Sequence, residues 1–163
     1  MNPVPAFSYG LNVAVSYKNF DLSMFWQGVA DQDIYNNQKF QTDFWSITDA
    51  GSNKGNRMLN AWTSDNTDSS IPALTTNNTA DEGRVSTYYV ENGSYLKLRT
   101  LQLGYNVPEK FISKLKMSSL RAYISGQNLL TLKSSSLTCS DPENPSWAYP
   151  LATSISFGLQ VGF

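Results

Sequence analysis

Alternation of apolar and polar side chains with a period of two is the dominant pattern in this sequence. In residues 7–17 the odd positions are aromatic or aliphatic, and the even positions are small or polar. The pattern is clearest in 151–163, where every odd position except Thr153 is apolar. Because side chains of a β-strand point alternately to opposite faces, these segments predict strands with one apolar face. The predicted strands are approximately 6–17, 22–29, 94–107, 119–130 and 151–163.

Two predicted strands depart from strict alternation. Phe25 interrupts the pattern of the second strand. In 94–107 the apolar positions are even up to Leu98 and odd from Leu101 onward. A β-bulge adds one residue to a strand and reverses its parity, so the sequence predicts a bulge at Arg99–Thr100.

The predicted connections alternate in length. A tight turn is expected at 18–21, and the segment 107–118 is short, with one or two helical turns beginning at Pro108. The other two connections, 30–93 and 131–150, are long loops rich in small polar residues. A short helix is expected in the first of them, at 40–47.

Strands of about ten residues suit a tilted bilayer crossing. Outer-membrane barrels have short periplasmic turns and long extracellular loops, whereas a soluble sandwich has no reason to sort its loops by length. The pattern therefore favours an all-β antiparallel meander within a transmembrane β-barrel. About five strands cannot close such a barrel, so a larger one is expected. A secreted β-sandwich that binds carbohydrate is the alternative.

Composition narrows the function classes. Charged residues make up 15% of the 163 residues, where about 25% is typical, and the net charge is −1. This balance offers no electrostatic attraction for nucleic acid. The absence of histidine excludes histidine-dependent catalysis and metal sites, and the single Cys139 excludes an internal disulfide. Asp31, Asp33 and Asp43 lack the spacing of a calcium loop, so they are expected to be solvated loop acids. No enzyme activity, cofactor or metal is therefore expected.

Several motifs resemble the C-terminal part of one transporter family. Residues 88–108 (YYVENGSYLKLRTLQLGYNVP) and 120–131 (LRAYISGQNLLT) are similar to a signature of SusC/RagA-type TonB-linked outer membrane transporters. Asp141-Pro142-Glu143, Tyr149-Pro150 and the segment 157–163 continue the resemblance in order. Segments 62–66 and 71–74 resemble the loop that precedes this signature.

The resemblance implies the fold and partners of the family. It implies that residues 1–163 form the last strands of a closed barrel whose plug domain and other strands lie outside this sequence. It also implies import of nutrients, glycans or peptides, across the outer membrane of a Bacteroidota-like bacterium. The implied partners are the rest of the barrel and the plug, outer-membrane lipid, a SusD-like surface lipoprotein, and the TonB complex through the N-terminal part.

Three groups of residues are candidates for function. With the resemblance, the apolar residues that close the chain are candidates for an assembly signal: Phe157, Leu159, Val161 and Phe163. Loop aromatics whose faces can stack on sugar rings are candidates for ligand contact, with loop packing as the alternative: Phe44, Trp45, Trp62 and Trp147. Aromatics assigned to strand ends are candidates for a girdle at the lipid interface: Tyr9, Tyr17, Trp26 and Tyr105.

Overall fold

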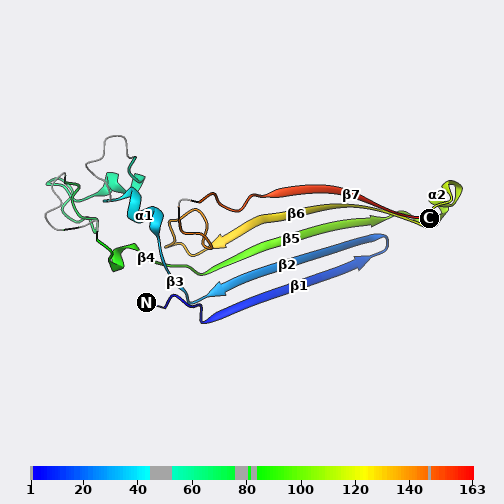
Figure 1. The fold of residues 1–163 in the computed structure, drawn as a ribbon, viewed down its shortest axis with the longest axis horizontal. Coiled ribbons are helices and arrows are strands. Elements are labelled where there is room, and N and C mark those ends of the chain that lie inside the picture. Colours follow the sequence, from blue (N-terminus) through cyan, green and yellow to red (C-terminus); the bar gives the residue numbers. More distant parts are fainter. Residues whose placement is uncertain (1, 45–52, 76–80, 82–83, 147) are drawn as a thin grey trace.

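A computed structural model describes residues 2–44, 53–75, 81, 84–146 and 148–163. Five of its strands form one long antiparallel sheet in the order β1-β2-β5-β6-β7, a meander (Figure 1). This confirms the predicted all-β meander. Its strands are β1 (Phe7–Tyr17), β2 (Phe20–Ala30), β5 (Tyr95–Asn106), β6 (Ser119–Lys133) and β7 (Ser154–Gly162).

The connections are sorted by length onto opposite ends of the sheet (Figure 1). At one end the β1–β2 turn has only Lys18 and Asn19, because β2 begins two residues earlier than expected. Lys18 adopts a left-handed φ of 54° there. The β5–β6 connection lies at the same end and contains α2 (Glu109–Ile112) and η3 (Ser113–Leu115). Pro108 precedes this helix as its N-cap residue rather than beginning it.

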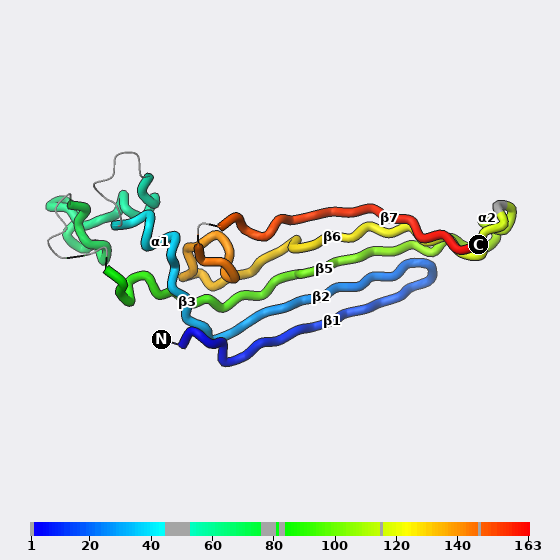
Figure 2. The backbone as a smooth tube through the Cα atoms, in the orientation of Figure 1, coloured from blue at the N-terminus to red at the C-terminus, as the bar shows by residue number. Residues whose placement is uncertain are grey.

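The five long strands run side by side (Figure 2), and their register aligns equivalent positions across the sheet. Residues directly opposite one another in paired strands share a face. One row crosses all five strands with apolar side chains, and we call it the apolar row: Val15, Leu22, Leu103, Ile124 and Phe157. The adjacent row points to the opposite face, and we call it the polar row: Ala14, Ser23, Gln102, Ser125 and Ser156. The sheet therefore has one apolar and one largely polar face.

Both departures from alternation have a structural cause. The register shifts on both sides of β5 at Arg99, which has no direct partner on β2 or β6. This shift confirms the predicted bulge and keeps Leu98 and Leu101 on one face. Phe25 lies on the polar face, where a β-carbon added at Gly10 would be 3.3 Å from its ring. The bare glycine leaves room for the aromatic side chain.

The connection between β2 and β5 contains more structure than the predicted loop. A second small sheet pairs β3 (Asp33–Tyr35) with β4 (Val90–Asn92). Between these strands lie α1 (Asn37–Thr42), η1 (Asn56–Asn60) and η2 (Thr87–Tyr89).

The helix begins three residues before the predicted 40–47. It starts early because the Asn36 side chain caps it, accepting a hydrogen bond of 2.9 Å from the Lys39 amide. Residues 45–47 lie outside the described part.

Both buried hydrophobic clusters of the described residues lie in the connections, although Val29, Tyr95 and Leu98 are also buried on the sheet. One cluster consists of Phe44, Met58, Ala61 and Tyr89. A second joins the two long connections through Ile34, Leu137 and Cys139. No helix in the described ranges is long and apolar enough to cross a bilayer.

Candidate functional site

The apolar face of the sheet is open over most of its length. The side chain of Phe157 is 81% exposed, and that of Leu159 is 73% exposed. No second sheet of comparable length packs on this face within the described residues, because β3 and β4 have three residues each. Exposed apolar area of this extent requires a partner that is itself apolar.

The girdle candidates all lie on this apolar face. Tyr17 stands beside the β1–β2 turn, and Tyr105 contacts Phe20 with ring centroids 4.8 Å apart. Tyr9 lies at the loop end, where its hydroxyl donates to the Tyr95 carbonyl at 3.4 Å. Trp26 lies in the strand interior, opposite Leu11 and Leu98, so its assignment to a strand end is wrong, because β2 extends from Phe20 to Ala30. Their role at a lipid interface remains a prediction.

The polar face carries an ion pair that crosses a strand. The Arg121 guanidinium on β6 donates from Nε to Asp21 on β2 at 3.1 Å, passing over β5. Asn106 also donates to this carboxylate, at 3.3 Å. A β-carbon on Gly104 would come within 2.5 Å of both charged groups, so the glycine makes room for the pair. Charged groups on this face indicate that it meets water or polar protein.

At the loop end of the polar face, Lys97 is almost completely buried, with 2% of its surface exposed. Its ammonium group donates to Asp141 at 2.6 Å and to Glu143 at 2.7 Å. Glu143 also accepts hydrogen bonds from Arg99 and from the Tyr95 hydroxyl, the latter at 2.6 Å. We call these five residues the loop anchor, because three belong to β5 and two to the β6–β7 connection.

Local geometry presents the two carboxylates of the loop anchor. Asp141 and Asn144 form a β-bridge around a tight turn, and Pro142 occupies the second turn position, which its fixed φ favours. The Asp141 side chain accepts from the Glu143 amide at 3.0 Å and from the Leu151 amide at 3.3 Å. The motif Asp141-Pro142-Glu143 is therefore a turn whose acidic side chains point at the sheet.

The electrostatics of the loop anchor favour ionised carboxylates. Burial alone would raise the pKa of Asp141 and Glu143. Hydrogen bonds from Lys97 and the other donors, together with the positive charge of Lys97, outweigh burial and lower the pKa of both groups below their ordinary values. The buried ammonium and the carboxylates thus stabilise one another, and each would be costly to leave alone.

A second polar cluster joins the two long connections to each other. The Asn36 side-chain amide donates to Glu91 at 2.8 Å and to the Thr138 hydroxyl at 2.9 Å. The Thr138 amide donates to Glu91 at 2.8 Å, and Lys39 lies 3.4 Å from the same carboxylate. Burial opposes ionisation, but these donors and the lysine charge lower the pKa of Glu91. We call these four residues the loop seam.

The β2–β5 connection has its own buried ion pair. Asp43 is fully buried and binds the Arg57 guanidinium at 2.7 Å. The Tyr88 hydroxyl donates to Asp43 at 2.8 Å, and burial together with that carboxylate raises the pKa of Tyr88. The expectation of a solvated acid at Asp43 is wrong, because Arg57 and Tyr88 compensate its burial. The described residues contain no group of side chains suited to a metal ion.

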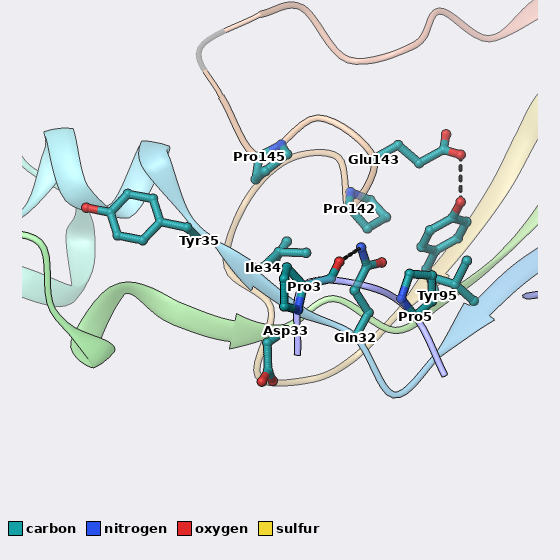
Figure 3. A pocket seen from close by; sticks show the side chains of 11 residues that line it. Pro3, Pro5, Gln32, Asp33, Ile34, Tyr35, Tyr95, Pro142, Glu143 and Pro145 are labelled. Carbon is teal, nitrogen blue, oxygen red and sulfur yellow. Dashed lines mark hydrogen bonds between the residues drawn. The ribbon is translucent and has the colours of Figure 1, made fainter. Parts of the chain in front are cut away.

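An open pocket of about 590 Å³ lies beside the loop anchor (Figure 3). Its lining includes Val29 and Tyr95 of the sheet, and Pro142 and Pro145 of the β6–β7 connection. The N-terminal segment contributes Pro3 and Pro5. Gln32 donates to the Pro3 carbonyl at 3.0 Å, which ties this segment to the β2–β3 corner.

The other sequence candidates have different environments. Phe44 is buried in the loop core and packs on Tyr88 at a ring-centroid distance of 5.6 Å, so its face is not open to a ligand. This corrects the ligand-contact expectation for Phe44, because loop packing covers the ring. Trp62 is 44% exposed, while Trp45 and Trp147 lie outside the described residues. Phe157, Leu159, Val161 and Phe163 are exposed, and their role in assembly remains a prediction.

Sequence reasoning did not find the loop anchor. Two signals were present: a lysine and an arginine inside a strand otherwise lined with apolar and neutral residues, and the acidic pair around Pro142. Nothing in the local pattern joins them, because Lys97 and Asp141 are 44 positions apart.

No protein-family model matches the chain. A curated relative, "TonB-dependent receptor P3" of Formosa agariphila, is 37% identical over 133 residues, covering 80% of this chain and 12% of the relative. "TonB-dependent receptor P26" of the same organism is 28% identical over 180 aligned positions, covering 99% of this chain and 17% of the relative. The chain thus spans less than a fifth of these relatives' length.

Solved structures agree with the sequence relatives. The RagAB peptide importer in its "open-open" state matches with a TM-score of 0.78 and 26% identity, covering 98% of this chain and 17% of that chain. Its "closed-closed" state matches with the same TM-score, identity and coverage. These names describe receptors and an importer, and none of them describes an enzyme.

Proposed function

Because this chain belongs to the SusC/RagA family of TonB-dependent transporters, we propose that it forms part of the barrel wall of an outer-membrane nutrient importer. In this proposal residues 1–163 are the C-terminal strands of the barrel and two of its extracellular loops. The plug and the remaining strands belong to the rest of the transporter. The apolar row crossing all five strands is the observation that carries the proposal.

The two faces of the sheet suit the two sides of a barrel wall. The open apolar face meets lipid, which needs no fixed packing shape. The polar face, with its ion pair between Asp21 and Arg121, lines the lumen. The short connections lie on the periplasmic side, and the long connections with the loop anchor lie on the extracellular side.

The proposed cargo is a nutrient oligomer, either a peptide or a glycan. RagAB is named a peptide importer, which supports the peptide class, and the resemblance to the family supports both. A surface lipoprotein of the SusD type is the proposed lid, and TonB the proposed energy source. The proposed location is the outer membrane of a Bacteroidota-like bacterium, the group implied by the motifs; the curated relatives come from Formosa agariphila.

Spin labels test the membrane orientation directly. Leu22→Cys and Ser23→Cys are prepared in the full-length transporter carrying Cys139→Ser, and each is labelled with a nitroxide in lipid vesicles. Leu22 belongs to the apolar row and Ser23 to the polar row, so the pair is matched in depth. The Leu22 label should collide with oxygen dissolved in lipid, and the Ser23 label with a water-soluble nickel complex.

The β-sandwich alternative predicts a different result. In a sandwich Leu22 would be packed in a protein core, and its label would be inaccessible to both reagents. A label on Leu22 that meets only the nickel complex would also refute the lipid-facing wall. Transport itself is tested by deleting the gene and comparing uptake of labelled peptides and labelled oligosaccharides, of which one class should be lost.

A further inference from the structure

The β6–β7 connection does not extend freely from the barrel wall. We infer that residues 134–146 and 148–153 belong to a strap that the loop anchor holds over the polar face, and that Lys97 is the positioning residue that keeps the strap closed. This inference rests on the proposed function, because the polar face must line the lumen for a strap there to narrow the extracellular mouth. Opening the strap would then widen the passage to the lumen.

Burial of Lys97 is the first observation. Lysine is almost never fully buried unless it is paired. Both carboxylates that contact its ammonium group, Asp141 and Glu143, belong to the strap. The lysine is therefore satisfied only when the strap is closed, and the strap's carboxylates are satisfied by β5.

The strap is held at two further places. At its far side, Thr138 joins the loop seam through Glu91 and Asn36. The Gln38 side chain accepts from the Ser140 amide at 3.0 Å and donates to the Ser146 carbonyl at 2.7 Å. The strap is thus connected both to the barrel wall and to the β2–β5 connection, so movement of one long loop is coupled to the other.

The position of the strap explains why it restricts passage. Its Pro142 and Glu143 line the open pocket together with Tyr95, whose hydroxyl is bonded to Glu143, at the loop end of the polar face (Figure 3). β5 runs away from this end, so polar-face residues beyond Arg99 lie deeper in the proposed lumen. A solute entering along this part of the wall must pass the strap before it reaches them.

Cys139 provides a reporter within the strap. Its thiol is fully buried beside Ile34 and Leu137, and burial raises the pKa of the thiol. A maleimide therefore reacts with it only when the strap leaves the second core cluster. The rate of alkylation at this residue, followed by mass spectrometry of the full-length transporter, measures strap opening without any transport assay.

The experiment compares Lys97→Met with Lys110→Met in the full-length transporter. Both remove one ammonium group, but Lys110 is exposed in α2 at the opposite end of the sheet. Lys97→Met removes the cation that pairs with the buried Asp141 and one of the two cations that contact Glu143, so it should accelerate Cys139 alkylation on the order of 100-fold. Lys110→Met should leave the rate unchanged. Lys97→Arg keeps the charge and should restore most of the protection.

A second variant covers the case in which Lys97→Met does not assemble. Glu143→Gln keeps the shape of the side chain and removes one charge, so it should give a smaller rise, about tenfold. Assembly is checked by the shift between folded and heat-denatured bands on a gel. Wild-type alkylation rates in an assembled Lys97→Met or Glu143→Gln protein would overturn the inference.

The width of the extracellular opening is tested with a cysteine placed deeper in the proposed lumen than the strap. Thr100→Cys, in a Cys139→Ser background, places a thiol on the polar face just beyond the bulge. Adding Lys97→Met should raise labelling by a polymer-linked maleimide several-fold more than labelling by N-ethylmaleimide, because only the large reagent is excluded by the strap. Equal changes for both reagents would overturn a role in restricting passage.

Failure of the strap and failure of the proposed function give different results. If the Leu22 label lies in lipid but Cys139 stays protected in every variant, the strap is wrong and the barrel wall stands. If the Leu22 label is not in lipid, the barrel wall is wrong, and the alkylation rates still report whether Lys97 holds the strap.

Discussion

Replacing Phe157 by lysine tests which face of the sheet meets hydrocarbon. Phe157 is one residue from Gly158, the middle of the nine-residue strand β7. A strand rises about 3.4 Å per residue, so at a tilt of about 45° the offset is about 2.4 Å of depth. The hydrocarbon core is about 30 Å thick, which places Phe157 close to the midplane if the centre of β7 lies there.

The expected cost follows from that depth. A lysine at the midplane of a barrel's lipid face costs about 2–4 kcal/mol of unfolding free energy. This corresponds to about a 30-fold to 900-fold change in the folding equilibrium constant. The matched control is Ser156→Lys, which belongs to the polar row and lies opposite Ser125. Its charge stays solvated in the lumen, so its cost should be within about 0.5 kcal/mol.

The measurement is a guanidinium titration of the full-length transporter in lipid vesicles, with the folded fraction read from the heat-sensitive gel shift. Phe157→Leu separates lipid from a packed protein core, because lipid adapts to the smaller side chain whereas a core would lose packing. It should cost much less than Phe157→Lys. Equal costs for the two lysine variants would show that the assigned lipid face is wrong.

Three further predictions concern backbone contact, buried charge and pH. Gly28→Ala should destabilise the barrel by about 1–3 kcal/mol in the same titration, because a β-carbon there would lie 2.6 Å from the Tyr95 carbonyl. Arg57→Leu should lower the free energy of local opening by about 3–5 kcal/mol, measured by chymotrypsin cleavage, because it leaves a buried carboxylate uncompensated. Glu91 has a lowered pKa, so its ionised form stabilises the loop seam at neutral pH, and that contribution is lost as the pH falls below the ordinary value of 4.5. A spin label on Ser136 should therefore become more mobile between pH 7 and about pH 3.5.

Each of these has an outcome that contradicts it. Gly10→Ala is the control for Gly28→Ala, because the nearest neighbour of a β-carbon at Gly10 is the movable Phe25 ring at 3.3 Å. An equal loss of stability in the two variants would refute backbone crowding at Gly28. Unchanged cleavage in Arg57→Leu would mean that Tyr88 alone compensates the acid. For the pH effect, Glu91→Gln should be mobile already at pH 7, and a rigid label in that variant would rule out the carboxylate as the cause.

Local pattern alone determined the five long strands and their faces. Alternation with a period of two is set by backbone geometry, so the assignment of Phe157 and Ser156 to opposite faces needs no tertiary contact. The bulge was equally visible, because a change of parity between Leu98 and Leu101 can only be accommodated by an extra residue. The sorting of short and long connections followed from the number and direction of the strands.

Only the tertiary structure decided what the long connections do. The β3–β4 pair joins residues more than 50 positions apart, and Asn36 reaches Thr138 across 102 positions. Such contacts depend on where the sheet places the two ends of each loop. Local sequence periodicity does not predict those positions. Phe44 shows the consequence: an aromatic residue in a polar loop suggested ligand contact, but the folded loop buries its ring against Tyr88. Lys97 is a similar case within a strand. Alternation assigned its side chain to the polar face, but its charge can be buried only because the β6–β7 connection supplies the carboxylates of Asp141 and Glu143.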